Sequence, residues 1–249
     1  MKNNKDIIRI EFSQTELIVI LILSFLFYIA AILLWKQNTI DNEIVIHFNY
    51  TYKNDMYFNL AKMFSRYGMS FIAILYSLII YLSFRKHELE IVRPLYFLII
   101  ISFFLTTLGG DLLKELIDKA RPVISLSGQV SIMQITATPA FPSGHAAKSM
   151  ALALPFFLLA PRNNNLLLAT KIILLITASF VCFSRIALQA HFLSDVLAGI
   201  GTALFFIPFA VLLTNKFYNK LKVDEVKLTL LSKRFVIIFI VFAVILGFM

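Results

Sequence analysis

Long apolar runs separated by short polar segments dominate the chain. A helix needs about 20 mostly apolar residues to cross the hydrocarbon core of a bilayer. The runs cover residues 17–35, 69–84, 94–114, 145–161, 166–188 and 192–214, with a shorter one at 235–249. This pattern predicts an all-α, polytopic membrane helical bundle with a six-helix core. The last run is either a seventh span, a tilted helix that includes residues 226–231, or a segment at the membrane interface.

Composition leads to the same class of protein. Of the 249 residues, 59% are hydrophobic and 15% are charged, whereas an ordinary soluble domain carries roughly 25% charged residues. We therefore expect a single membrane-embedded domain over residues 1–249. The one cysteine, Cys182, lies in an apolar run, so the sequence offers no disulfide framework.

The basic residues mostly flank the apolar runs, where they set the orientation of membrane proteins. The formal net charge of +9 therefore indicates topology, and we expect no nucleic-acid partner. Positive-inside counting predicts a cytoplasmic N-terminus, with residues 36–68, 115–144 and 189–191 outside and a basic loop and apolar segment at 215–249 inside. The first run is longer than a signal-peptide core and lacks a following cleavage pattern, so we expect it to be retained.

Residues 56–68 of the first outer loop combine apolar positions at helical spacing with Lys62 and Arg66. This pattern is typical of a helix that lies in the membrane interface. A helix packed on the outer surface of the protein fits the pattern equally well.

Ionisable and small polar residues gather where the apolar runs meet the outer side. Ionisable residues within spans usually mark function, whereas those at span ends are usually anchors. Because successive spans alternate in direction, four separate segments bring these residues to one depth of the membrane. They are Lys114, Arg121, Ser143, Gly144, His145, Arg185, His191 and Asp195.

This set of side chains suits the binding and transfer of a phosphoryl group. Lysine and arginine provide positive charge, and arginine binds phosphate oxygens in a bidentate manner. Ser143 and Gly144 stand at the start of a helix, where free N–H groups and the helix dipole attract anions. Asp195 lies one turn after His191 and can hold one ring nitrogen while the other attacks. His145 can protonate the leaving oxygen.

Each feature also has an ordinary structural explanation. A lysine at the end of a span is usually an anchor, and Pro-Ser-Gly is usually a turn that caps a helix. His191 and Asp195 can form a simple hydrogen bond or half of a metal site. The nearby cations and the lack of a third ligand argue against a metal, so we expect no metal and no cofactor. The joint position of all these residues at one depth favours function.

Three groups of these residues resemble the signature of the type 2 phosphatidic acid phosphatase superfamily, which includes membrane lipid phosphatases and vanadium-dependent haloperoxidases. In the first, Lys114 is followed after six residues by Arg121 and Pro122; the second is Pro142-Ser143-Gly144-His145. In the third, Ser184-Arg185 is followed after five residues by His191 and after three more by Asp195. The resemblance covers residues 114–195 without departures at the signature positions.

The resemblance implies a metal-independent lipid phosphatase with a six-helix membrane core. His191 would form a phosphohistidine with the help of Asp195. His145 would act as the general acid and later help to activate water. The phosphate would be bound by Lys114, Arg121, Ser143, Gly144 and Arg185.

The resemblance also limits the substrate to a lipid phosphate or pyrophosphate at the membrane surface. We expect an enzyme of the bacterial inner membrane that acts on the periplasmic side, with lipid A favoured. Undecaprenyl pyrophosphate, phosphatidylglycerol phosphate and phosphatidic acid are alternatives. Lys148, one turn deeper than His145, either contacts the head group, snorkels outward or is paired within the bundle. A lipid phosphotransferase and a non-catalytic lipid-binding or transport protein are rival functions, and the oligomeric state is open.

Overall fold

The computed structural model describes residues 9–51, 56–130 and 138–248. Within these ranges the chain is helical and has no strand, which confirms the predicted all-α fold. The α-helices are α1 (Gln14–Gln37), α2 (Thr39–Thr51), α3 (Met56–Ser83), α4 (Arg93–Ile117), α5 (Pro122–Ser125), α6 (Gly144–Leu159), α7 (Asn165–Ala187), α8 (Leu193–Leu221) and α9 (Glu225–Phe248). A 3₁₀ helix at His87–Val92 precedes α4.

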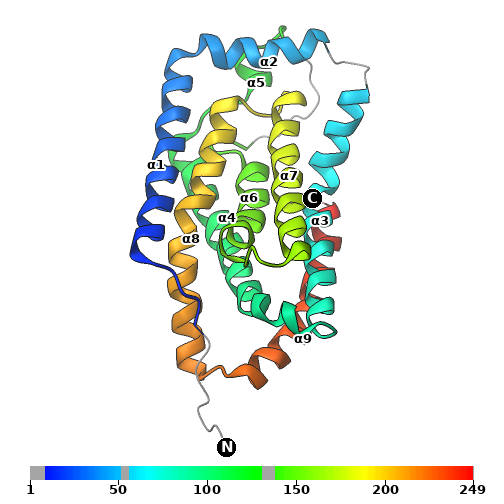
Figure 1. Ribbon diagram of the computed structural model, residues 1–249. Helices are drawn as coiled ribbons and strands as arrows, with labels where there is room; N and C mark the ends of the chain where they lie inside the picture. Colours follow the sequence, from blue (N-terminus) through cyan, green and yellow to red (C-terminus); the bar gives the residue numbers. More distant parts are fainter. Residues whose placement is uncertain (1–8, 52–55, 131–137, 249) are drawn as a thin grey trace, which may run out of the picture.

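Six helices of the described chain are long and apolar enough to cross a membrane. They are α1, α3, α7, α8, α9 and the segment that contains α4. Helix α6 has only 16 residues and contains Pro155. It lies at the centre of the bundle against α4, α7 and α8 (Figure 1). Neighbouring helices therefore cover its backbone, and α6 has little need to reach across the bilayer by itself.

The helices run roughly parallel to one another, with α1 against α8 on one side and α9 against α3 on the other (Figure 1). The α1–α8 contact is close because Gly201 has no side chain: a Cβ there would lie 3.2 Å from the carbonyl oxygen of Ser24. The hydroxyl of Ser24 donates a hydrogen bond of 2.8 Å to the carbonyl of Gly201. Small residues and interhelical hydrogen bonds of this kind are what hold membrane helices together.

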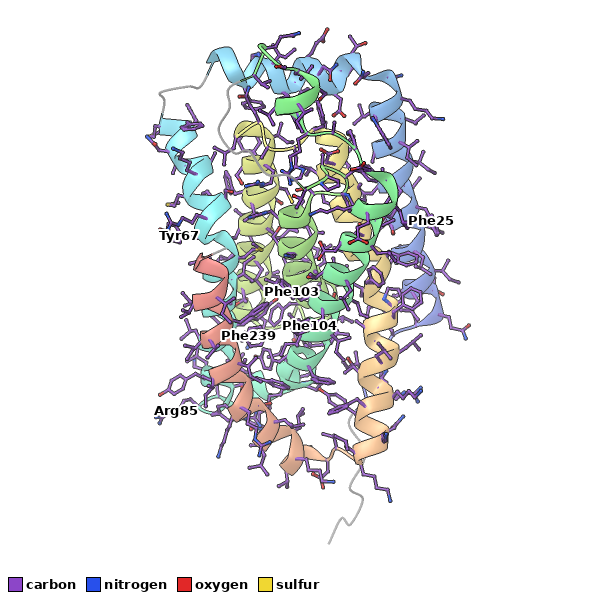
Figure 2. The ribbon with its side chains drawn as sticks, turned by 180° about the vertical axis from the view of Figure 1, so that it is seen from behind. Phe25, Tyr67, Arg85, Phe103, Phe104 and Phe239 are labelled. Atoms are coloured by element: carbon purple, nitrogen blue, oxygen red, sulfur yellow. The ribbon has the colours of Figure 1, made fainter. Side chains whose placement is uncertain are left out.

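Helix α9 joins the core through aromatic side chains. Phe239 is buried and its ring lies 5.3 Å from that of Tyr76 in α3. Figure 2 shows Phe239 beside Phe103 and Phe104 of α4. The last apolar run is therefore part of a longer helix that starts at Glu225 and packs on the bundle.

The long outer segment differs from its prediction. Residues 56–68 do not form a separate interfacial helix, because they are the first half of α3 and continue into the second span. Their apolar periodicity runs on in phase, and Gly68 lets α3 approach Val181 of α7 closely. Residues Thr39–Thr51 form α2, which the sequence pattern did not predict and which crosses one end of the bundle (Figure 1).

The predicted basic loop after the sixth span is also mostly helical. Helix α8 continues to Leu221, and α9 begins at Glu225 after a turn in which Lys222 has a φ of 48°. Lysine is a good helix former, so the helix extends past the end of the apolar run. The chain reverses over only a few residues, and this places α9 back against the bundle.

Candidate active site

The residues singled out in the sequence come together at one end of the bundle, beneath α2. The end of α7 and the start of α8 meet there, next to the start of α6 and the turn that follows α4 (Figure 1). Main-chain hydrogen bonds fix this junction. Ser143 N–H donates to the carbonyl of Asp195 at 2.8 Å, and His191 N–H donates to the carbonyl of Arg185 at 3.1 Å.

His191 has a defined tautomer in this arrangement. Nη1 of Arg121 lies 3.3 Å from Nε2 of His191. A guanidinium only donates, so Nε2 must accept and its lone pair faces the cation. The ring proton of neutral His191 is therefore on Nδ1, which lies 3.5 Å from Oδ2 of Asp195. This separation is at the limit of a hydrogen bond, and Nδ1 has no aligned acceptor among the described residues.

The environment of His191 favours the neutral ring. His191 lies in the turn between α7 and α8 and is only 2% exposed. Burial lowers the pKa of His191 from 6.5 to about 4, while Asp195 acts in the opposite direction and the positive charges of Arg185 and Arg121 add to the lowering. At neutral pH the imidazole is therefore uncharged and Nε2 keeps its lone pair.

Asp195 is held at both carboxylate oxygens. Oδ1 accepts a hydrogen bond of 2.8 Å from Nζ of Lys119, and Oδ2 accepts one of 2.9 Å from the N–H of Phe192. The second bond satisfies an N–H group at the start of α8, as an acidic residue in the first turn of a helix commonly does. The carboxylate is thus fixed with Oδ2 toward the ring of His191.

The start of α6 forms a concentration of hydrogen-bond donors. Ser143 is the N-cap residue, and its hydroxyl is buried without a hydrogen-bond partner among the described residues. The N–H groups of the first turn have no partner within the helix. Nζ of Lys114 lies 3.2 Å from the place where a Cβ on Gly144 would be. Lys114 and the helix terminus therefore face the same small volume, which a side chain at residue 144 would occupy.

Gly199 permits this helix start to lie against α8. A Cβ on Gly199 would lie 2.7 Å from the carbonyl oxygen of Ser143 and 3.0 Å from the nitrogen of Ala147. Both contacts are with backbone, which cannot move aside as a flexible side chain can. The absence of a side chain at Gly199 is thus a condition for bringing α6 and Asp195 together.

The other arginines are held from several helices. The guanidinium of Arg121 donates to the carbonyls of Thr138 at 2.8 Å and Ala190 at 3.1 Å. Arg185 is buried, and its Nη1 donates to the hydroxyl of Ser65 in α3. Both guanidinium groups are therefore fixed in position near His191.

His145 and Lys148 lie close to the same group of charges. The ring of His145 is within electrostatic range of Arg185, His191, Lys148 and Lys114. Lys148 also interacts with Lys114 through charge. The structure thus brings every predicted site residue to the end of the bundle that α2 crosses, with Lys148 one helical turn away from His145.

Several residues that support the site were not singled out in the sequence. The most important is Lys119, which the sequence marks only as one of the basic residues near the end of an apolar run. Its partner Asp41 was not singled out either. Neither belongs to the quoted signature, and their contacts arise from the fold. A lysine two residues before Arg121 was the only available signal.

Positive charge at the site comes from side chains. In residues 9–51, 56–130 and 138–248, no three His, Cys, Asp or Glu side chains are grouped so as to hold a metal ion. Lys114, Arg121 and Arg185 provide three cations around His191 and the start of α6.

Comparison with known proteins identifies the family and the fold. No curated protein sequence matches the chain. The fold is similar to the crystal structure of a transmembrane PAP2-type phosphatidylglycerolphosphate phosphatase from Bacillus subtilis, with a TM-score of 0.55 and 19% identity. The match covers 81% of this chain and 96% of that one. Residues 91–219, which include every candidate site residue, match the PAP2 superfamily, and the chain belongs to that superfamily of membrane phosphatases.

Proposed function

We propose that the chain is an integral membrane lipid phosphatase in which Nε2 of His191 attacks the phosphorus of a lipid head group. The observation that carries the proposal is the pair of contacts on the two ring nitrogens of His191. Arg121 lies at Nε2 and Asp195 faces Nδ1, at 3.3 and 3.5 Å. This arrangement leaves a neutral, oriented nucleophile next to a group that binds phosphate.

The reaction has two steps. In the first, the Nε2–P bond forms while the bond from phosphorus to the lipid oxygen breaks, and the proton on His145 passes to that oxygen. In the second, His145 takes a proton from water, the water oxygen bonds to phosphorus, and the N–P bond breaks to release inorganic phosphate. Lys114, Arg121 and Arg185 neutralise the phosphoryl oxygens throughout, together with the donors at the start of α6.

The positive side chains make a divalent cation unnecessary for charge neutralisation in this mechanism. We therefore expect phosphate release to continue in EDTA and to be inhibited by vanadate, which has the shape and charge of phosphate. Loss of turnover in EDTA with recovery on addition of Mg²⁺ would contradict the mechanism.

The substrate is a lipid that presents its phosphate at the membrane surface while its acyl chains remain in the bilayer. Lipid A is the substrate favoured by the sequence, and Lys148 adds a positive charge that suits a head group with more than one anionic site. Phosphatidylglycerol phosphate is a second candidate because a PAP2-type enzyme of similar fold acts on it. Undecaprenyl pyrophosphate is the third candidate substrate.

Phosphate release from these three lipids and from phosphatidic acid, measured with purified protein in detergent, distinguishes the candidates. We expect release from at least one, with the highest kcat/KM on lipid A. A higher value on phosphatidylglycerol phosphate would assign the second candidate. Transfer of phosphate to an added alcohol in place of release would indicate a phosphotransferase. No release from any lipid, with His191→Ala binding them as well as the wild type, would indicate a non-catalytic lipid-binding protein.

We place the protein in the bacterial inner membrane with its N-terminus in the cytoplasm and the site toward the periplasm. Cysteines at Ser127, in the exposed turn after α5, and at Asn163, in the exposed turn between α6 and α7, test the orientation. An impermeant thiol reagent should label Ser127→Cys in intact spheroplasts and Asn163→Cys only after lysis. The opposite pattern would reverse the orientation. The native Cys182 is buried and serves as the unlabelled background.

A further inference from the structure

We propose that Lys119 and Asp41 are positioning residues for the nucleophile, through a buried chain of charges that runs from α2 to Asp195. The inference rests on the proposed role of His191. It adds residues that lie outside the signature, one of which belongs to a helix outside the matched region 91–219.

The ammonium group of Lys119 lies between two buried carboxylates. Nζ lies 2.8 Å from Oδ1 of Asp195 and 3.5 Å from Oδ2 of Asp41. It also donates to the hydroxyl of Ser194 at 2.6 Å. Lys119 therefore neutralises two buried carboxylates from different helices, and an unneutralised carboxylate in such a place is costly.

Helix α2 provides the far end of this chain. Asp41 is 1% exposed. Its Oδ1 accepts a hydrogen bond of 3.0 Å from the N–H of Ser194, and its Oδ2 accepts one from the Ser194 hydroxyl. Asp41 thus caps the start of α8 from another helix, one residue before Asp195.

Three aromatic rings fix the ammonium group in place. Nζ of Lys119 lies 4.5 Å from the ring centre of Phe192, 5.2 Å from that of Trp35 and 5.9 Å from that of Phe141. These distances are within the range of cation–π attraction, about 6 Å. The rings come from α1 and from the segments that precede α6 and α8, so they restrict movement of the charge in several directions.

The main chain of Lys119 has a related role. Its carbonyl accepts a hydrogen bond of 2.8 Å from the N–H of Ala140, in the segment that leads into α6. One residue therefore positions both the carboxylate that faces His191 and the approach to the phosphate-binding helix start. Because Nδ1 of His191 is 3.5 Å from Asp195, a small rotation of this carboxylate decides whether the pair is aligned.

The test compares variants by kcat and KM per folded molecule on the lipid that the wild type hydrolyses. Lys119→Met should reduce kcat by about 10- to 100-fold, the effect expected for a misplaced catalytic group, with KM within about twofold because Lys119 does not face the phosphate. Lys119→Gln should also lower kcat and leave KM unchanged, but the decrease should be smaller because glutamine keeps a hydrogen-bond donor. This variant takes the place of Lys119→Met if the methionine protein does not fold. The control is Glu43→Gln, which removes an exposed carboxylate from α2, the helix that contains Asp41, and should match the wild type.

Rescue by charge balance separates positioning from a purely structural role. Lys119→Met leaves Asp41 and Asp195 without a shared cation, so Asp41→Asn in the same protein should restore kcat by about tenfold or more. A wild-type kcat in Lys119→Met or Lys119→Gln would overturn the inference, and so would a double variant no better than Lys119→Met. Failure of the wild type to release phosphate from any lipid would instead overturn the proposed function.

Discussion

Nη1 of Arg121 and Nε2 of His191 are 3.3 Å apart, so the cation stands at the nitrogen that attacks in the proposed reaction. The positive charge of the guanidinium disfavours protonation of Nε2. The guanidinium also lies beside the position that the phosphate oxygens would take when Nε2 attacks phosphorus. Its Nε and Nη1 donate to the main-chain carbonyls of Thr138 and Ala190, and its Nη2 donates to the hydroxyl of Thr138, which together hold it in place. In the proposed reaction Arg121 thus adds to the effect of burial in keeping the ring of His191 neutral, and it also attracts the phosphate.

Replacement of Arg121 by lysine should show that geometry matters here as well as charge. Lysine keeps the charge but has no planar fork with which to hold the two carbonyls and a phosphate together. We expect Arg121→Lys to lower kcat/KM by about 100-fold, roughly the effect of one lost charge-assisted donor in a transition state. Arg66→Lys, at an exposed position of α3, is the matched control. Equal loss in both variants would show that the effect is not specific to the site.

Replacement of His145 by alanine should have an effect that depends on the leaving group. A general acid matters most when the leaving oxygen is basic, as a lipid alcohol is. We expect His145→Ala to lose about 1000-fold in kcat on a lipid phosphate and much less on an aryl phosphate with an acidic leaving group. His87→Ala, at the exposed first residue of the 3₁₀ helix before α4, should match the wild type on both substrates. A uniform loss across leaving groups would remove His145 from the acid role.

Much of this site follows from the order of residues in the sequence. The apolar runs fix which ends of the helices share a membrane surface, so Lys114, His145 and His191 could be placed together before any contact was known. The supporting contacts could not be foreseen in the same way. Lys119 binds Asp195 over a separation of 76 residues, and Asp41 binds Ser194 over 153. No local periodicity indicates such pairs, because they depend on how α2 crosses the bundle.

The length of the helices was also only partly predictable. Hydropathy marks the part of a helix inside the bilayer, whereas α3 and α8 extend beyond it through mixed apolar and polar residues that include lysines, which are good helix formers. For this reason the predictions of a separate interfacial helix at 56–68 and of a basic loop after 214 were wrong. The helical membrane bundle was right, and each predicted apolar run corresponds to a helix in the predicted order, although α6 is shorter than a full span and α9 is long enough to be one.

The low pKa of His191 gives a pH prediction with a definite sign. Burial lowers this pKa to about 4, so the ring stays neutral while the pH falls from 7 to about 5. In the unfolded chain the same ring protonates near pH 6.5, so its contribution to folding stability is complete above pH 6.5 and is lost as the pH falls toward 4. A histidine NMR titration of the His145→Gln protein should show His191 titrating near pH 4. Titration near 6.5 would contradict the buried, neutral nucleophile.

The contact at Gly199 makes a prediction for stability and activity together. In Gly199→Ala the new Cβ would meet the backbone of Ser143 at 2.7 Å, so α6 and α8 must move apart. We expect a loss of about 1–3 kcal/mol in the free energy of unfolding, typical of overpacking, and a lower kcat per folded molecule. Gly110→Ala is the control, because nothing lies within 4 Å of its Cβ position. Equal midpoints of thermal unfolding for the two variants would contradict the account of this contact.

The central claim is that phosphate is transferred to Nε2 of His191, and direct detection of that adduct tests it most directly. The enzyme is mixed with an activated phosphate ester, quenched in alkali, where a phosphohistidine survives, and digested for mass spectrometry. We predict one phosphate on the peptide that contains His191. It should accumulate in His145→Ala, where water is poorly activated, and be absent in His191→Ala. Turnover with no phosphate on His191 at any quench time, or with phosphate on another residue, would contradict the account.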